Sequence, residues 1–292
     1  MKKLTVLITA CLLLSPVFAE EVDRKLTAAA AGQVDISNIA GSVKVNGWSR
    51  NEVEVTGTLG PNVEELIFER DDDTITIKVK VPRKSKRGID SDLRISVPEA
   101  SSIDVSAVSA DIDVADVLGE QQLHTVSGDV QTEAAGEDIV AASVSGDVEV
   151  SGSLRDIEME ASTVSGDVTL FRIAGEVSAE SVSGDVIVDE GAFDRVDLST
   201  VNGDVLFQAA LREGGKLSAE TVNGDISVDF VGDVSARIDV SSFNGKIRNC
   251  FGPDAERSSK YTPGWSLEFT AGDGDGRVDI STMNGGIRLC RD

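Results

Sequence analysis

Apolar and polar residues alternate in short segments along most of the chain, and an alternation with a period of two is the pattern of half-buried β-strands. Gly, Pro, Asn and Asp separate the segments, as expected for turns. No segment has a sustained helical period, so the sequence predicts an all-β protein. In the first part of the chain the predicted strands cover 33–36, 41–45, 52–58, 66–69 and 74–81, and the last two are expected to form a hairpin.

From about residue 107 the strand pattern becomes a repeat. One six-residue phrase returns six times along the following part of the chain. Its copies recur with a period of about 20 residues, which is typical of repeat architectures. The phrase reads TVSGDV at 125–130, SVSGDV at 143–148, TVSGDV at 163–168, SVSGDV at 181–186, TVNGDV at 200–205 and TVNGDI at 221–226, with looser copies at 107–112, 242–247 and 282–287.

Two folds could use these repeats. In one, the Gly-Asp bends are tight turns of antiparallel hairpins, for which Asn-Gly is the strongest short signal. In the other, each repeat is one coil of a parallel β-solenoid, and each position lies about 4.8 Å over its counterpart one coil earlier. Because every position of the phrase repeats, we expect a parallel β-solenoid, a single-stranded β-helix with coils of about 20 residues. Its interior would hold an aliphatic ladder of Val130, Val148, Val168, Val186, Val205 and Ile226.

The predicted organisation has three parts. Residues 1–19 form a signal peptide, residues 20–106 form strands and hairpins that cap the solenoid, and residues 107–292 form the solenoid repeats. Two Gly-Pro or Pro-Gly pairs interrupt the repeats near the end of the chain. They predict a loop insertion at about 251–277.

Residues 1–19 have the pattern of a secretory signal. Two lysines precede an apolar run over residues 4–14, and small residues precede a predicted cleavage site between Ala19 and Glu20. The run is too short to span a bilayer as a helix, and no later segment comes near the required length. In an alternative reading, residues 8–11 resemble a lipoprotein cleavage box that would leave Cys11 lipidated. The protein is exported in either case.

The mature chain keeps two cysteines, Cys250 and Cys290, and disulfides persist in exported proteins. Residues 238–250 align without gaps on residues 278–290, at an offset of about two periods. A full coil between them would separate the cysteines by about 9.6 Å, too far for a disulfide. If the intervening residues loop out, the two coils are neighbours. We therefore predict a Cys250–Cys290 bridge.

Charge and composition exclude several partners. Removal of the signal takes the net charge from −24 to −26. Nucleic acids and anionic membrane surfaces require clustered cations, so neither is an expected partner. Aromatic residues make up only 4% of the chain, which argues against an extended sugar-binding face.

Signals for catalysis are few. The single histidine, His124, is expected to be structural, because no Gly-x-Ser-x-Gly elbow supplies a nucleophile. No metal-ligand spacing, phosphate loop or dinucleotide fingerprint appears. An enzyme acting on acidic polysaccharides would need basic residues, and in the repeats these are scattered among many more acids at Arg155, Arg172, Arg195 and Arg212. We expect a non-enzymatic protein without a cofactor.

The aspartates of the phrase are the candidates for cation binding. In a solenoid they stack along one edge, where neighbouring carboxylates about 5 Å apart repel by roughly 1 kcal/mol in water. This cost is tolerated if each Asp accepts a hydrogen bond from a corner amide, and weak calcium binding is the alternative use. The calcium candidates are Asp129, Asp147, Asp167, Asp185, Asp204 and Asp225 in the column, with Asp273 and Asp275 in the Gly-rich segment 272–276.

Three features together resemble a known family. They are the repeated TVSGD or TVNGD phrase, AGSVKVNGW at 40–48 and STMNGGIRL at 281–289. The chain is similar over nearly its whole mature length to the bacterial β-strand-repeat family named putative adhesins. The resemblance implies a β-helical fold and an adhesin-like role, and it brings no catalytic residues because that family is a domain of unknown function. Lys246 and Gly286 stand where the other repeats have Asp.

The sequence therefore predicts an exported, non-enzymatic protein of the cell envelope, periplasmic or at the cell surface. It would present an acidic surface to an envelope or cell-surface partner that the sequence does not identify. Two alternatives stay open, which are a polysaccharide-acting β-helix enzyme and an envelope stress-associated structural protein without a ligand of its own.

Overall fold

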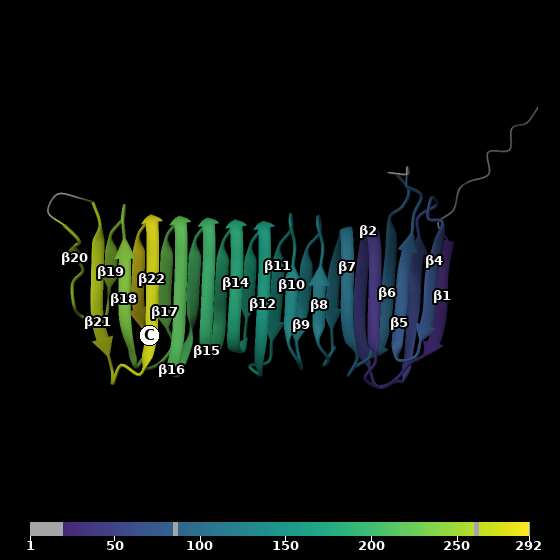
Figure 1. Ribbon diagram of the computed structural model, residues 1–292, viewed down its shortest axis with the longest axis horizontal. Helices are drawn as coiled ribbons and strands as arrows, with labels where there is room; N and C mark the ends of the chain where they lie inside the picture. The colour runs from purple at the N-terminus through teal and green to yellow at the C-terminus, as the bar shows by residue number, and fades with distance from the viewer. Residues whose placement is uncertain (1–19, 84–86, 260–262, 292) are drawn as a thin grey trace, which may run out of the picture.

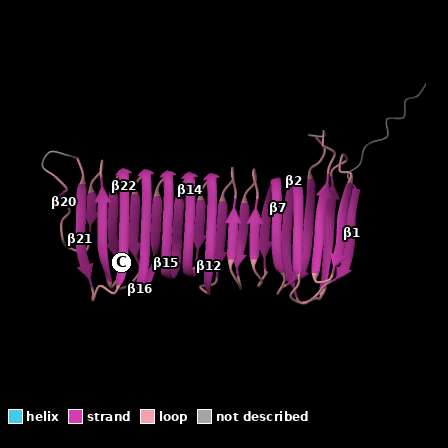
Figure 2. Ribbon diagram, in the orientation of Figure 1, coloured by secondary structure: helices cyan, strands magenta, loops and turns pink. Residues whose placement is uncertain are grey.

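The computed structural model describes residues 20–83, 87–259 and 263–291, which form a long stack of β-strands (Figures 1 and 2). The prediction of an all-β protein is confirmed, since these ranges contain strands and turns and no helix. In particular, they contain no helix long and apolar enough to cross a membrane. The predicted signal peptide, with Cys11 and Ala19, lies outside the described residues.

Each central coil contributes one strand to either side of the stack, and the Gly-Asp corner joins the two. Neighbouring coils pair in parallel, so that Val148 lies opposite Val130 and Ile226 lies opposite Val205. Face A, which holds the strands before the corner, contains β8 (Gln121–His124), β10 (Ile139–Ala142), β12 (Asp156–Ser165), β14 (Ala174–Ser183) and the second halves of β15 (Val186–Asn202) and β16 (Val205–Asn223). Face B contains β9 (Val130–Ala134), β11 (Val148–Gly152), β13 (Val168–Phe171), the first halves of β15 and β16, and β17 (Ile226–Phe230).

Strand β7 (Ser102–Ala115) shows how a strand turns the corner. Its residues alternate between buried and outward positions except at Val108 and Ser109, which both point outward. These two consecutive outward residues shift the alternation by one position. The strand can therefore bury one set of side chains on face A and continue with a new buried set on face B.

The core runs the length of the stack between the two faces. The predicted aliphatic ladder of Val130, Val148, Val168, Val186, Val205 and Ile226 is confirmed, since each of these side chains is at most 1% exposed. Each buried aliphatic side chain contributes roughly 1.5–3 kcal/mol. Towards the C-terminal end aromatic rings lie beside this ladder. Successive ring centroids are 5.7–6.4 Å apart along Phe193, Phe207, Phe230, Phe251 and Phe269.

The last two coils lie in space in the reverse of their sequence order. On face A, β22 (Gly276–Asn284) pairs with β16 on one side and with β18 (Ala236–Ser242) on the other. On face B, β23 (Ile287–Arg291) lies likewise between β17 and β19 (Ile247–Asn249). The final coil of the sequence therefore fills a place inside the stack, and the coil before it is the outer one (Figure 1).

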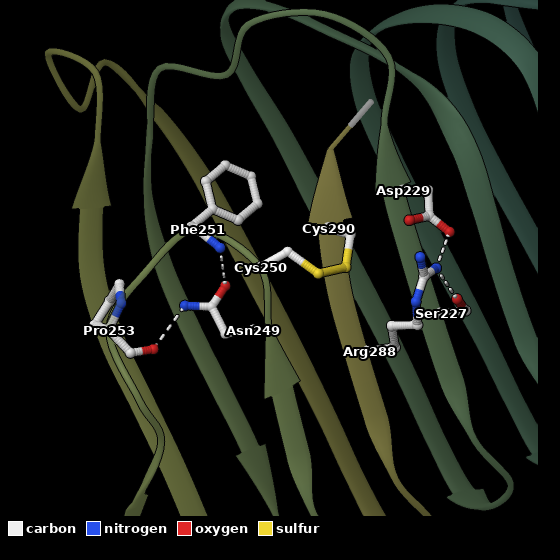
Figure 3. Close-up of a disulfide and its surroundings, with 8 residues drawn as sticks. All are labelled: Ser227, Asp229, Asn249, Cys250, Phe251, Pro253, Arg288 and Cys290. Atoms are coloured by element: carbon white, nitrogen blue, oxygen red, sulfur yellow. Dashed lines mark hydrogen bonds and ion pairs between the residues drawn. A yellow bond between two sulfur atoms is a disulfide. The ribbon is translucent and has the colours of Figure 1, made fainter.

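The predicted Cys250–Cys290 disulfide is present and links these two coils (Figure 3). The Cα atoms of the two cysteines are 4.8 Å apart, because β19 and β23 are direct neighbours. The loop insertion expected at about 251–277 lies between these two coils in the sequence, and it contains strands that the sequence did not indicate. Within it, β21 (Trp265–Ala271) pairs antiparallel with β18, and β20 (Glu256–Arg257) pairs with β21. Strand β21 thus covers an edge of β18 that would otherwise expose unpaired backbone groups.

The N-terminal end has the same reversal. Strand β2 (Gln33–Trp48) pairs in parallel with β7 along both faces. On its other side β2 pairs with β5 (Thr74–Lys80) and β6 (Ser91–Pro98), so parallel stacking extends into the region where the sequence predicts a separate cap. The end is closed by antiparallel pairs of β1 (Glu20–Thr27) with β3 (Glu52–Leu59), of β3 with β6, and of β4 (Glu65–Asp71) with β5, the last pair being the predicted hairpin.

We expect the double substitution C250S/C290S to lower the free energy of unfolding by about 3 kcal/mol, because the bridge spans 40 residues and restricts the unfolded chain. Urea denaturation without reductant measures the loss, and wild-type protein treated with reductant is the matched control. Two reactive thiols in the native, unreduced protein would contradict the bridge.

Candidate functional site

The corners of neighbouring coils approach one another through their glycines. A β-carbon on Gly146 would lie 2.0 Å from the carbonyl oxygen of Gly128, and one on Gly166 would lie 2.2 Å from that of Gly146. A side chain cannot occupy such a position. Glycine is therefore needed at these corners for close backbone approach.

The Ser or Thr at the first position of each phrase is buried inside the corner and stabilises it. Its hydroxyl donates a hydrogen bond to a corner carbonyl of the preceding coil, at 2.9–3.1 Å, and its side chain is buried. The hydroxyl satisfies a carbonyl that the bend would otherwise leave unpaired. The pairs are Thr125 with Ala110, Ser143 with Gly128, Thr163 with Gly146, Ser181 with Gly166, Thr200 with Gly184, Thr221 with Gly203, Thr282 with Gly224 and Ser242 with Gly285.

The aspartates of the phrase form the expected column on the outside of the corner. Each Asp accepts, through Oδ1, a hydrogen bond from the backbone N–H of the equivalent residue one coil further on, at 2.7–3.1 Å. The interpretation in which each Asp bonds a corner amide is therefore confirmed. The acceptors are Asp111, Asp129, Asp147, Asp167, Asp185, Asp204 and Asp225.

The other two calcium candidates lie at the turn between β21 and β22. There the N–H groups of Asp273 and Gly274 donate to the hydroxyl of Ser235, at 3.0 and 3.2 Å. Across the described ranges, no three His, Cys, Asp or Glu side chains gather in a way that could hold a metal ion.

The Val at the second position of the phrase points away from the core. With its counterparts in the looser copies it forms one column, which we call the corner stripe, along about 38 Å of the stack at one strand spacing per coil. Each member is 37–55% exposed. In spatial order the stripe contains Val108, Val126, Val144, Val164, Val182, Val201, Val222, Met283 and Phe243.

Sequence reasoning missed this stripe, although a signal for it is present. Leu123 and Thr125 are both buried, so the period of two along β8 places Val126 outside. The same alternation of buried and exposed positions predicts an exposed apolar side chain at the second position of every phrase.

At its C-terminal end the stripe borders a groove of about 710 Å³. Apolar side chains of the stripe, including Val222, Phe243 and Met283, line one part of the groove, and Trp265 of β21 lines another. Ser and Thr side chains supply most of the remaining lining. The guanidinium of Arg257 lies 5.3 Å from the centre of the Trp265 ring, an arrangement typical of a cation–π contact. The groove therefore combines apolar surface with hydroxyl groups.

Acidic residues concentrate in the middle of the stack. Residues 101–190 contain 20 acidic and two basic residues, which accounts for −18 of the net charge of −24. The stripe consequently runs through a strongly negative region.

The arginines considered for a polysaccharide-binding groove bond mainly to groups of this chain. Arg155 donates to the carbonyl oxygen of Ala135, Arg195 pairs with Asp197, and Arg212 pairs with both Asp156 and Asp194. The hydrogen bond from Arg212 holds the pKa of the Asp156 carboxyl below its ordinary value. The fourth, Arg172, has a left-handed backbone with φ 58° and lies at a turn. Arg155, Arg172 and Arg212 lie at neighbouring turns, since Leu154 N–H donates to the carbonyl oxygen of Arg172 and Arg212 reaches Asp156, whereas Arg195 lines a groove on face A.

His124 lies on the outer side of β8, in register with Ser106 and Ala142 of the neighbouring strands. These strand neighbours carry neither a carboxylate to orient the imidazole nor a thiol for it to activate. His124 is therefore a surface residue of face A.

A protein-family model described as Toastrack DUF4097 matches residues 17–181 and again residues 174–289. The two matches together cover almost the whole chain, and the resemblance to the family named putative adhesins is confirmed. No curated protein matches the chain.

The solved structures that are similar to the chain include three bacterial proteins of different descriptions. A putative lipid binding protein from Parabacteroides distasonis ATCC 8503 is 14% identical over 92% of this chain and 96% of that one, with a TM-score of 0.45. A putative adhesin from Bacteroides fragilis NCTC 9343 is 11% identical over 94% and 97%, with a TM-score of 0.43. A putative cell adhesion protein from Clostridium sporogenes ATCC 15579 is 9% identical over 94% and 100%, with a TM-score of 0.27. All three likenesses are remote, and none bears on what this chain binds.

Calcium binding by the eight candidate aspartates stays a prediction. A bound ion would stabilise the native state and raise the melting temperature. Thermal unfolding with and without millimolar calcium measures this, and an unchanged melting temperature would contradict calcium binding.

We expect Gly166→Ala to lower the free energy of unfolding by about 3 kcal/mol, because its methyl group forces two corners apart. Gly286→Ala is the matched control, since a β-carbon there lies no closer than 3.4 Å to the backbone of the next coil. Chemical denaturation of both variants measures the difference. Equal stability of the two variants would show that the corner contact does not constrain the stack.

Proposed function

This chain belongs to the Toastrack DUF4097 family, and on that basis we propose that it is an exported, non-enzymatic parallel β-solenoid of the cell envelope with coils of about 20 residues. Its role in this proposal is adhesin-like, with a partner held along the corner stripe. The parallel pairing of each repeat with the one before it, seen from β9 to β17, supports the architecture.

The corner stripe is the observation that carries the proposed role. Its members are 37–55% exposed, on the outside of the coil, where a polar side chain would fit equally well. Single exposed apolar side chains are normal on protein surfaces, whereas contiguous apolar patches mark sites of interaction. A column of apolar side chains repeated at nine corners is such a patch.

The charges beside the stripe indicate the chemistry of the partner. The Asp column runs along the same corner, and most of it lies in residues 101–190, which contain 20 acidic and two basic residues. A second copy of the chain would bring two strongly acidic surfaces together, which is unfavourable. A polypeptide segment in which apolar residues alternate with Lys or Arg fits both the stripe and its surroundings. We propose a segment of this kind as the partner.

The disulfide supports export, because disulfides persist in oxidising compartments outside the cytosol. The predicted signal over residues 1–19 agrees with it. The alternative of a polysaccharide-acting enzyme gains no support from the arginines, since Arg155, Arg195 and Arg212 bond to groups of this chain. The alternative of a structural protein without a ligand does not account for the exposed apolar side chains of the corner stripe.

We expect a short fluorescent peptide that alternates lysine and valine to bind the protein, and V144S/V164S/V182S to weaken this binding at least tenfold. Partly burying three valines contributes about 2 kcal/mol, which is more than the roughly 1.4 kcal/mol that corresponds to a tenfold change. Fluorescence anisotropy measures the affinity. The triple variant should keep the melting temperature of the wild type, because the three side chains lie outside the core.

The matched control is L118S/F171S/V231S, which changes three exposed apolar side chains away from the stripe and should bind the peptide as the wild type does. A peptide that alternates glutamate and valine should not bind. Equal affinity of the two triple variants would overturn the stripe as the binding surface. Absence of binding by the wild type would overturn the proposed partner chemistry.

A further inference from the structure

The column of Asp carboxylates ends one coil before the outer end of the stack. Asp225 Oδ1 accepts the N–H of Gly286 at 2.7 Å, and Lys246 occupies the equivalent position one coil further out. Since Gly286 has no side chain, no acceptor within the described ranges faces the backbone N–H of Lys246. A neighbouring column of Asn side chains does continue to the outer coil, because Asn223 donates to Asn202, Asn284 to Asn223 and Asn244 to Asn284, each at 2.9 Å. What is missing at this corner is therefore one carboxylate.

The place of the missing carboxylate is sterically open. A β-carbon on Gly286 would lie 3.4 Å from the carbonyl oxygen of Lys246 and 3.7 Å from Asp225 Oδ1, which are ordinary contacts. By contrast, a β-carbon on the adjacent corner residue Gly285 would lie 1.8 Å from a carbonyl oxygen. A groove of about 390 Å³ lies at position 286, and it is lined by residues that include Ser227, Lys246, Arg248 and Arg288.

Cations gather around this groove in a chain whose net charge is −24. Arg248 and Arg288 are direct neighbours on β19 and β23. Arg288 bonds to Asp229 and lies beside Ser227 (Figure 3). Arg248 and the side chain of Lys246 have no carboxylate partner in the part of the chain that the structure describes. Like charges side by side on neighbouring strands are unfavourable unless an anion is shared between them.

The disulfide keeps these groups in place. Cys250 and Cys290 each follow the paired arginines by two residues, and the N–H of Cys250 donates to the carbonyl oxygen of Leu289 at 2.9 Å. Strands β19 and β23 are therefore held together directly beside the cationic groove, so the site is organised before any ligand binds.

We propose that this corner binds a carboxylate group, which accepts the N–H of Lys246 in the place of the missing Asp side chain. Arg248 and the Lys246 ammonium supply the countercharge. The bound group would lie about 4.8 Å from the Asp225 carboxylate, as successive carboxylates do along the column, and repulsion over that distance is weak in water. The Lys246 ammonium and the Arg248 guanidinium, which line the same groove, oppose this repulsion. The site is independent of the corner stripe.

Two sources can supply such a carboxylate, an acidic sugar or an acidic side chain of a protein. Glucuronate and N-acetyl-aspartate amide are therefore the two probes, and the backbone amide resonance of Lys246 reports on binding. We expect a saturable shift at millimolar concentration. Binding of one probe at least tenfold more tightly identifies the source.

Gly286→Asp is the decisive variant, because it supplies the carboxylate from within the chain. We expect it to abolish the shift with both probes and to raise the melting temperature. Arg248→Ala should weaken binding about tenfold without changing the melting temperature, and Arg237→Ala, an exposed cation on face A of the same coil, should leave binding unchanged. A shift that persists in Gly286→Asp, or the absence of a saturable shift in the wild type, would overturn the proposal.

Discussion

The contact between the glycine of one corner and the carbonyl oxygen of the glycine one coil earlier is the constraint on which the stack depends. A β-carbon at this contact would lie about 2 Å from that oxygen, so only glycine lets neighbouring bends stack closely. The close approach brings the Ser or Thr hydroxyl within reach of a carbonyl and the Asp carboxylate within reach of an amide. Backbone amide and carbonyl groups that a sharp bend would leave without a hydrogen-bond partner are thereby paired. The Val at the second position of the phrase points to the outside of the coil and takes no part in these hydrogen bonds.

Much of this architecture could be predicted because each position of the phrase resembles itself one period later. Parallel neighbours and the aliphatic ladder follow from that likeness. The disulfide follows from the alignment of the two coils that carry its cysteines and from the loop expected between them. The reversed order of the end coils could not be predicted. The sequences of the last two coils are so similar that the pattern does not indicate which of the two is the outer one. Strand β21 was missed since Pro263 and Gly264 before it and the glycines after it indicate a loop.

The candidate sites also differ in how far the sequence predicts them. That each Asp accepts a backbone amide could be inferred from turn chemistry, but that the amide belongs to the next coil is seen only in the structure. The stripe required counting the strand phase through the corner at Val108. Lys246 and Gly286 are visible in the sequence as departures from the phrase. The neighbouring coils expected for the disulfide also place one of these residues over the other. Their meaning depends on which of the two coils is the outer one, and that is seen only in the structure.

The reversed coil at each end limits how such a stack can change in length. Strands β22 and β23 occupy a slot between two coils that precede them in the sequence, and β2 occupies the corresponding slot between two coils that follow it. Removal of β22 and β23, or of β2, would therefore leave a gap inside the stack rather than a shorter rod. Between β7 and β16 each coil meets only its two neighbours in sequence, so a duplicated unit of about 20 residues would lengthen the molecule by one strand spacing, about 4.8 Å. Evolution can thus adjust the reach of the protein in single-coil steps while both closures stay intact.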